Sequence, residues 1–330
     1  MKRVLLWFVA LAGIAVAAAA IAAIVAWVRF HEPGPLAADT TVTIARGAGV
    51  GRIAEQLVAA GVLDEPWTFR VGVAAAGGDR VLRAGEYRLP AAISPRGVVD
   101  LLASGRTVVH RLAIPEGLTT AQVLALVRQS DVLEGEISAA PAEGALLPET
   151  YFLSRGDQRS ALIERQRKAM DDALAQLWAE RSPGLPFKSP REALILASIV
   201  EKETAAEAER PRVAAVFINR LKKGMRLQAD PTVVYGLTDG KGALDRPLSR
   251  ADLETRHPWN TYVVDGLPPT PIANPGRSAL EATLKPADSE ELYFVADGSG
   301  GHVFAKTLAE HNRNVTRLRA AERSRGGNAQ

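Results

Sequence analysis

The chain has 330 residues, of which 47% are hydrophobic, with 40 basic against 37 acidic side chains and no cysteine. This length allows two or three domains with sizeable cores. The missing cysteines exclude thiol catalysis, cysteine-ligated zinc, iron–sulfur clusters and disulfides, and a formal net charge of +3 is too small to indicate a nucleic-acid partner.

The first predicted element is a membrane-spanning helix. No charged residue occurs from Val4 to Val28, and a helix of that length spans roughly 37 Å, more than the hydrocarbon core of about 30 Å. Lys2 and Arg3 precede this run, which favours a cytoplasmic N-terminus. The alternative is a cleaved signal peptide, whose apolar region is normally only about 7–15 residues long. We therefore expect residues 1–30 to be an uncleaved single-pass anchor.

A small α+β module is predicted next, over residues 41–108. The Pro- and Gly-containing segment 31–40 predicts a linker before it. Within the module, alternation and helical spacing of apolar residues predict strands and helices in mixed order, with Ser94 capping the last helix. The expected strands are 41–44 and 84–89, and the expected helices are 50–61, 66–76 and 94–105.

The remainder of the chain divides at a proline-rich break, residues 182–190. Before the break, residues 109–185 predict a connecting region with a strand, a short helix capped by Thr119 or Thr120, a loop around Pro148 and a long helix over about 158–181. After it, residues 186–320 predict a mixed α/β catalytic domain, including a hairpin that turns at the GSGG of 298–301. Residues 321–330 predict a flexible tail.

Several signatures of known chemistry are absent. The segment GLTDGKG at 236–242 has the wrong spacing for a phosphate loop and lacks its final Ser or Thr. The sequence contains no H-E-x-x-H, its histidines are scattered, and neither G-x-S-x-G nor S-x-x-K occurs at a candidate serine. We therefore expect no metal and no cofactor.

The most informative segment is the helix predicted over 191–210, REALILASIVEKETAAEAER. On a helical wheel Glu203 lies in the middle of the apolar arc, whereas Glu201 lies on a thinner face. Burial without a cationic partner raises the pKa of a carboxyl, so that a buried glutamate can donate a proton near neutral pH. Glu203 is therefore the candidate general acid, although a solvated glutamate at a helix end gives the same pattern.

Two later segments supply candidate substrate contacts. MRLQADPTVVYG places polar groups around a predicted proline turn, and NTYVVDGLPPTPIANPG predicts a long ordered loop. Amides and aromatic rings on such loops suit carbohydrate hydroxyls and ring faces. The alternative for Asn260 and Asn274 is that they only form turns. The candidates from both segments are Gln228, Asp230, Tyr235, Asn260 and Tyr262.

With these segments the sequence resembles a known family. SIVEKET, FINRL, GMRLQADPTVVYG, LSRADLET, NTY, GLPPTPIANPG and YFVADGSGGHVF occur in the order found in the endolytic murein transglycosylase family, also called YceG-like or MltG. The N-terminal anchor matches as well, and residues 41–105 resemble the LysM-like peptidoglycan-binding module of that family. The likeness covers nearly the whole chain.

The resemblance implies an inner-membrane protein whose periplasmic domain cleaves nascent glycan strands internally, between N-acetylmuramic acid and N-acetylglucosamine and without water. It implies that the second glutamate of E-K-E-T, here Glu203, is catalytic. Glu201 is a candidate supporting residue that would orient or tune Glu203, although it faces elsewhere on the helix. Peptidoglycan synthases are implied as partners. Two alternatives remain open: a hydrolytic muramidase that uses Asp230 as a second carboxylate, and a non-enzymatic peptidoglycan-binding scaffold.

Overall fold

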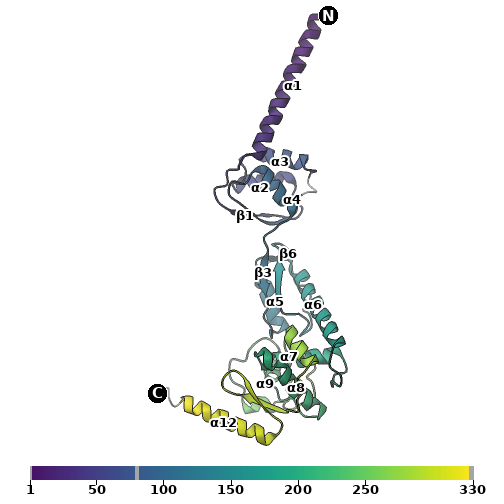
Figure 1. Cartoon of the computed structure of the whole chain (residues 1–330), viewed down its shortest axis with the longest axis vertical. Coiled ribbons are helices and arrows are strands. Elements are labelled where there is room, and N and C mark those ends of the chain that lie inside the picture. Colours follow the sequence, from purple (N-terminus) through teal and green to yellow (C-terminus); the bar gives the residue numbers. More distant parts are fainter. Residues whose placement is uncertain (1, 79–81, 327–330) are drawn as a thin grey trace. The chain divides into compact units, whose positions relative to one another are not determined.

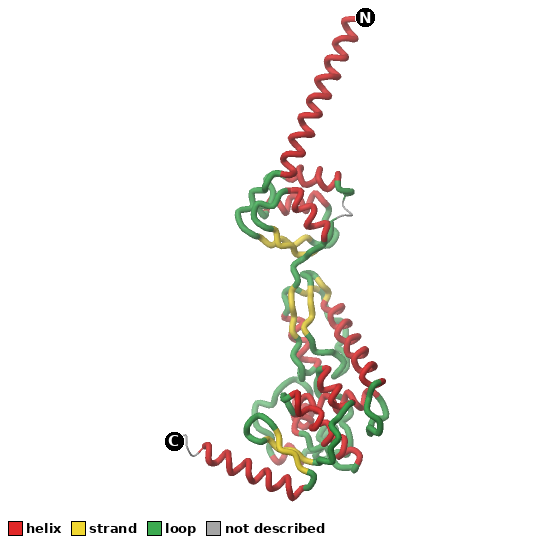
Figure 2. The backbone as a smooth tube through the Cα atoms, in the orientation of Figure 1, coloured by secondary structure: helices red, strands yellow, loops and turns green. Residues whose placement is uncertain are grey.

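The structure is a computed structural model that describes residues 2–78 and 82–326. Its internal contacts divide the chain into two units. Unit 1 comprises Met1–His110 and Phe152–Asp157, and unit 2 comprises Arg111–Tyr151 and Gln158–Gln330. Figure 1 follows the chain from α1 to α12, and Figure 2 marks its helices, strands and loops. Most of the predicted connecting region, 109–185, thus belongs to the same unit as the predicted catalytic region.

Unit 1 begins with the long apolar helix α1, Lys2–His31. Its segment Leu6–His31 has a mean hydropathy of 2.7 and no part of that apolar window is buried against the rest of the protein. Large side chains such as Trp7 and Trp27 are exposed along it. The helix is long and apolar enough to cross a membrane, and a signal sequence would satisfy the same criterion.

The rest of unit 1 is a small α+β core, as predicted. Strand β1 (Thr40–Ile44) pairs antiparallel with β2 (Gly85–Leu89). Helices α2 (Val50–Ala59), α3 (Pro66–Ala75) and α4 (Pro95–Ser104) contribute the other core residues. The largest fully buried side chains here include Tyr87 and Phe69. The alternation of buried and exposed residues in β1 follows the period of a strand with one face on the core.

Local signals explain the boundaries of α4. The Ser94 hydroxyl accepts a hydrogen bond from the backbone N–H of Gly97 at 3.1 Å, which satisfies one of the free donors at the helix start. Gly105 follows the helix with φ of 68°, a left-handed conformation that glycine adopts without steric cost. The sequence prediction for this helix is confirmed at both ends.

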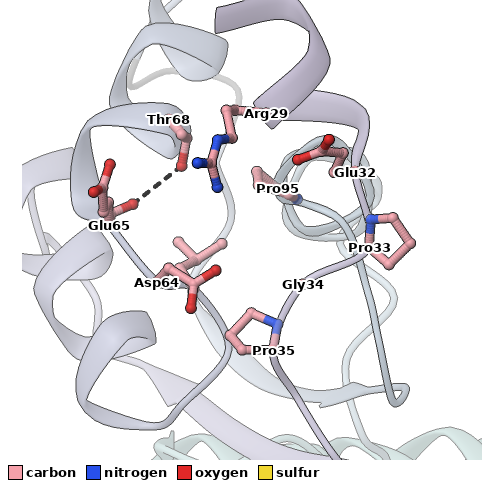
Figure 3. Close-up of a pocket in the computed structure, with 10 residues that line it drawn as sticks. Arg29, Glu32, Pro33, Gly34, Pro35, Asp64, Glu65, Thr68 and Pro95 are labelled. Carbon is pink, nitrogen blue, oxygen red and sulfur yellow. Dashed lines mark hydrogen bonds between the residues drawn. The ribbon is translucent and has the colours of Figure 1, made fainter. Parts of the chain in front are cut away.

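A small cavity lies where α1 meets the α+β core (Figure 3). Its volume is about 60 Å³, room for only a few water molecules. The Thr68 hydroxyl donates to the Glu65 carbonyl at 3.0 Å on one wall, and Arg29 and Asp64 lie at other walls. The cavity is too small to hold a sugar ring.

Unit 2 is mainly helical, with short strands in two-stranded pairs. Helices α7 (Pro190–Glu203), α8 (Arg210–Lys222) and α11 (Arg277–Leu284) pack against one another, and α6 (Arg159–Ala179) packs on α7 and α11. The remaining helices are α5 (Thr120–Gln129), the 3₁₀ turn η2 (Glu207–Glu209), α9 (Asp230–Thr238), α10 (Arg250–Glu254) and α12 (Leu308–Gly326).

The strands of this part of the chain are short. β3 (His110–Ala113) pairs with β5 (Thr150–Leu153), and β4 (Leu133–Glu134) pairs with β6 (Asp157–Gln158). β7 (Tyr293–Ala296) and β8 (His302–Ala305) form an antiparallel hairpin, as predicted. The core beneath the hairpin contains Leu196, Ile199, Val213, Phe217, Leu227 and Ile272.

The helix predicted over 191–210 ends at Glu203 and is followed by the separate turn η2. Three further segments differ from the sequence prediction. The predicted proline turn at 230–231 is the start of α9, because proline is tolerated in a first turn, where its missing N–H is not needed. Residues 150–153 of the predicted loop form β5. Helix α12 continues to Gly326, so residues 321–326 of the predicted tail are helical, which suits their Ala, Glu and Arg content. Residues 327–330 of that tail lie outside the described residues.

Candidate functional site

Glu203 is the last residue of α7, the central helix of unit 2. Ser189 caps the helix by accepting from the backbone N–H of Glu192 at 3.4 Å, and the proline in its first turn suits that position. Leu196, Ile199 and Val200 are fully buried along the same helix. Because these apolar residues determine which face of α7 packs on the core, they also determine the direction in which the Glu203 side chain points.

The Glu203 carboxyl is in an environment that disfavours its charged form. Surrounding protein atoms remove most of its hydration, and the negative charge of Asp230 acts in the same direction, whereas the positive charge of Arg220 opposes both. Together they raise the pKa of Glu203 to about 8. The residue as a whole is partly exposed at the end of the helix. Near neutral pH the Glu203 carboxyl is therefore protonated, the state of a general acid.

Asp230 is the neighbouring carboxyl, and its surroundings are the opposite of those of Glu203. It is exposed, it starts α9, where the helix dipole favours a negative charge, and it accepts a hydrogen bond from the Tyr262 hydroxyl at 2.5 Å. Burial, together with Asp230, raises the pKa of Tyr262, so that this phenol stays a donor. Two carboxyls with different surroundings thus act on one another in one site, the Glu203 carboxyl buried and Asp230 exposed.

Arg220 of α8 supplies the opposing positive charge and was not among the predicted site residues. Its guanidinium donates to the carbonyls of Leu292 and Leu227, each at 2.7 Å, and the side chain is buried. Burial lowers its pKa, but an arginine remains charged. In the sequence, Arg220 lies in the FINRL motif of a predicted amphipathic helix. An arginine on such a helix is normally solvated, so nothing in the motif indicated that this one is buried.

Glu201 points to a different set of partners from Glu203. Its side chain is only 5% exposed, pairs with Arg210 at 3.0 Å and accepts from the Gly276 N–H at 2.9 Å. Arg210 also contacts Glu116 at 3.1 Å. Burial raises the pKa of Glu201 in spite of this pairing. Glu201 therefore ties α7 to the start of α11, and the charges that act on Glu203 are those of Asp230 and Arg220.

The five predicted substrate contacts separate into two groups. Asp230, Tyr262 and Tyr235 retain exposed or partly exposed side chains, and Gln228 is exposed immediately before α9. Gln228 has a φ of 52°, a conformation that non-glycine residues adopt mainly where the surrounding structure requires it. Its backbone N–H donates to the Thr261 carbonyl at 3.1 Å, which holds this bend against the 260–263 loop.

Asn260 is in the second group, because its amide is used inside the protein. It is 1% exposed, its NH₂ donates to three carbonyls at the end of α10, and its oxygen accepts from the Tyr262 N–H at 2.9 Å. Asn274 is also buried and holds the loop before α5. A direct contact of Asn260 with substrate does not fit this burial. Asn260 holds the end of α10, whereas Asn274 bonds to segments far away in the chain and so does more than form a turn.

An open cavity of about 730 Å³ lies beside these carboxyls. Asp230 and Lys202 lie at its edge, and Tyr235 lines its wall. Its remaining lining comes from the start of α5, from α9, from residues 242–248 and from Ile272. The volume lies within the roughly 300–1,000 Å³ that is typical of small-molecule sites. Within residues 2–78 and 82–326, no three His, Asp or Glu side chains are grouped to hold a metal ion.

An uncharged carboxyl that ends a helix beside an open cavity belongs to the class of general-acid sites. The model of the YceG-like family matches residues 42–317 of the chain. This match covers most of the sequence, and the chain therefore belongs to the YceG-like family.

Known relatives agree with this assignment. The chain is 32% identical over 321 residues to the endolytic murein transglycosylase of Bacillus subtilis strain 168, with 86% of each chain covered. It is 29% identical over 324 residues to the endolytic murein transglycosylase of Streptococcus pneumoniae strain D39, of which it spans 57% of the length. A crystal structure of a YceG-like protein from Listeria monocytogenes matches with a TM-score of 0.51 and 33% identity, covering 83% of this chain and 98% of that one.

Proposed function

We propose that this protein is a membrane-anchored lytic transglycosylase that cleaves peptidoglycan strands internally, between N-acetylmuramic acid and N-acetylglucosamine. The observation that carries the proposal is the Glu203 carboxyl, whose pKa is raised to about 8 by burial and by Asp230. The name shared by the curated relatives, endolytic murein transglycosylase, supports the substrate and the internal cleavage. No cofactor is needed for this chemistry.

In the first step the protonated Glu203 donates its proton to the glycosidic oxygen. The bond from C1 of the muramoyl residue to that oxygen breaks, and the leaving N-acetylglucosamine keeps the proton as a hydroxyl. The carbonyl of the 2-acetamido group of the muramoyl sugar stabilises the developing oxocarbenium ion. Because the substrate supplies this group, a second catalytic carboxylate, which ordinary glycosidases require, is not needed.

In the second step the Glu203 carboxylate acts as a base. It removes the proton from the 6-hydroxyl of the same muramoyl sugar, and the oxygen attacks C1 to give a 1,6-anhydro end. Glu203 is then protonated again and ready for the next cleavage. No water is consumed, so the masses of the two products sum to the mass of the substrate.

The products distinguish this reaction from its alternatives. Mass spectrometry of glycan strands digested with the purified full-length protein should detect 1,6-anhydro-muramoyl ends, each lighter by one water than a reducing end. Reducing ends instead would establish a hydrolytic muramidase, with Asp230 as the second carboxylate. Strands that are bound but left uncut would establish the scaffold.

The proposal also includes the topology. Helix α1 would anchor the chain in the inner membrane with a cytoplasmic N-terminus, so that both remaining regions are periplasmic and act on nascent strands close to the membrane. Cleavage there would end glycan elongation, which makes peptidoglycan synthases the expected partner class. The LysM-like role of unit 1 is part of the same proposal. Sequencing the N-terminus of the mature protein separates an anchor from a cleaved signal peptide.

The pH dependence of cleavage should report the pKa of Glu203. The acid must be protonated in the free enzyme, so kcat/KM is expected to be constant at slightly acidic pH and to fall as the pH rises through about 8. The Asp230→Asn variant removes the charge that helps to keep Glu203 protonated, and the alkaline limb of its pH profile should therefore move to lower pH.

Asp265→Asn is the matched control for this measurement, because Asp265 is 79% exposed and pairs with Arg226. Its pH profile should equal that of the wild type. A loss of about 10³-fold or more in Asp230→Asn at every pH would assign Asp230 a direct chemical role and favour the hydrolytic alternative.

A further inference from the structure

Glu143 is a largely buried carboxyl that the proposed reaction does not use. It lies in the loop before β5, and its Oε1 accepts from the backbone N–H groups of Thr120 at 2.7 Å and Gly144 at 3.3 Å. Its Oε2 accepts from the Tyr235 hydroxyl at 3.2 Å. Burial raises the pKa of Glu143, which these hydrogen bonds partly offset. The residue thus connects the start of α5 to a side chain of α9.

Tyr235 is the partner that reaches the cavity. Its hydroxyl is held by Glu143, and its ring lies 5.7 Å from the Trp259 ring, centroid to centroid. Trp259 is itself fixed by a hydrogen bond from its indole N–H to the Thr270 hydroxyl at 2.9 Å. Tyr235 is among the residues that line the cavity, and its hydroxyl is engaged by Glu143.

The other groups at the cavity complement a sugar. A pyranose has an apolar C–H face, which packs on an aromatic ring, and a polar edge of hydroxyl and acetamido groups. Lys202, Gln122 and Asp230 line the same cavity and provide donors and acceptors for such an edge. Asp230 also acts electrostatically on Glu203, so the cavity and the candidate acid share this residue.

We propose that this cavity is a saccharide subsite in which one N-acetylated pyranose ring of the glycan packs on Tyr235, and that Glu143 is a positioning residue that holds the tyrosine ring in place. The inference rests on the proposed function, since it assigns part of the same glycan to the cavity. It gives Glu143 a role that its position in a loop before β5 does not reveal in the sequence.

Binding can be measured without cleavage in the Glu203→Gln background. The probe is a tetrasaccharide of alternating N-acetylglucosamine and N-acetylmuramic acid, titrated by calorimetry into the full-length protein. Tyr235→Ala should weaken its binding by about tenfold or more, because the stacking surface is lost. Tyr235→Phe keeps the ring but loses the hydrogen bond that positions it, so its Kd should rise to the same extent as that of Glu143→Ala. An unchanged Kd in Tyr235→Ala overturns the subsite.

The role of Glu143 has its own readout. Glu143→Ala should weaken binding as much as Tyr235→Ala, and the double variant should be no weaker than Tyr235→Ala alone, because both changes remove the same contact. Glu143→Gln keeps the hydrogen bond to Tyr235 and should restore binding. If the double variant multiplies the increases in Kd of the two single variants, or if Glu143→Gln binds as weakly as Glu143→Ala, Glu143 does not act through Tyr235.

Leu237→Ala is the matched control on the same helix, since Leu237 is 38% exposed and does not line the cavity. It should leave the Kd unchanged.

Cleavage kinetics separate the two proposals: in the Glu203-containing protein, Tyr235→Ala should raise KM more than it lowers kcat. If the wild type cleaves glycan and Tyr235→Ala has a normal KM, the subsite fails and the function stands. If the wild type never cleaves but binding depends on Tyr235, the function fails and the subsite stands.

Discussion

Replacing Glu203 with glutamine is expected to lower kcat for glycan cleavage by about 10³-fold or more, since general acid–base catalysis contributes roughly 10²–10⁴-fold and the proposed reaction uses this residue as acid and base in turn. Glutamine has the shape of a protonated glutamate but cannot give up a proton to the leaving oxygen. KM should change little, because the amide can keep the contacts of the uncharged carboxyl. The measurement is the rate of anhydro-end formation.

Glu207→Gln is the control for this change. Glu207 is exposed in η2, close in sequence to Glu203, and its replacement should leave the rate unchanged. Cleavage by Glu203→Gln at the wild-type rate would show that the catalytic acid is another residue.

The same variant should be more stable than the wild type at alkaline pH. The pKa of Glu203 is about 8 in the folded state against 4.5 in the unfolded chain, so the unfolded state alone loses its proton as the pH rises between these values. Ionisation thus favours unfolding of the wild type, whereas glutamine does not titrate. Below pH 4.5 the difference disappears. Above pH 8 we expect a gain of roughly 2–4 kcal/mol. Thermal unfolding at several pH values measures it.

Arg210→Met is expected to cause the largest loss of stability. The Arg210 side chain is 8% exposed and is the cationic partner of Glu201, which is 5% exposed, and of Glu116. Removing one partner of a buried ion pair leaves an uncompensated buried charge, which costs about 3–5 kcal/mol. At roughly 2–4 °C per kcal/mol for a unit of this size, Tm should fall by about 6–20 °C.

Two further variants test this reason for the loss. Glu201→Gln in addition to Arg210→Met removes the stranded charge and should recover part of the lost stability. Arg212→Met on the same helix removes a guanidinium that is 50% exposed and pairs with Glu291, and it should cost at most about 1 kcal/mol. If Arg210→Met and Arg212→Met lower the free energy of unfolding equally, the burial of an ion pair does not determine how much that pair stabilises the fold.

The sequence and the structure agree most closely where the determining interactions are local. The helix that begins after Ser94 and ends before Gly105 follows from a side-chain cap and a left-handed glycine, both encoded within a few residues of the helix. The β7–β8 hairpin follows from two apolar runs around a Gly-rich turn. The turn predicted at Pro231 is wrong, because this proline lies in the first turn of α9. Proline is common both in loops and in first turns of helices, and only the packing of α9 distinguishes the two cases.

The candidate site was predicted less completely, because its electrostatics depend on residues that are distant in the chain. Helical periodicity alone separated Glu203 from Glu201 and placed Glu203 on the apolar face. It could not reveal that Glu201 has a buried arginine partner, since Arg210 lies beyond the end of α7 and reaches back to it. Nor could it reveal that the Asn260 amide donates to three carbonyls at the end of α10.

The amino-acid sequence by itself thus determined the apolar helix α1, the mixed module that follows it and the identity of the candidate acid, because these depend on composition and on the period of a helix. It also located the excess hydrophobicity of the chain in that one N-terminal segment. Only the tertiary structure decided the protonation state of Glu203, because desolvation and the charges of Asp230 and Arg220 arise when α7, α8 and α9 are brought together. The reactive carboxyl is encoded locally, and its pKa is a property of the fold.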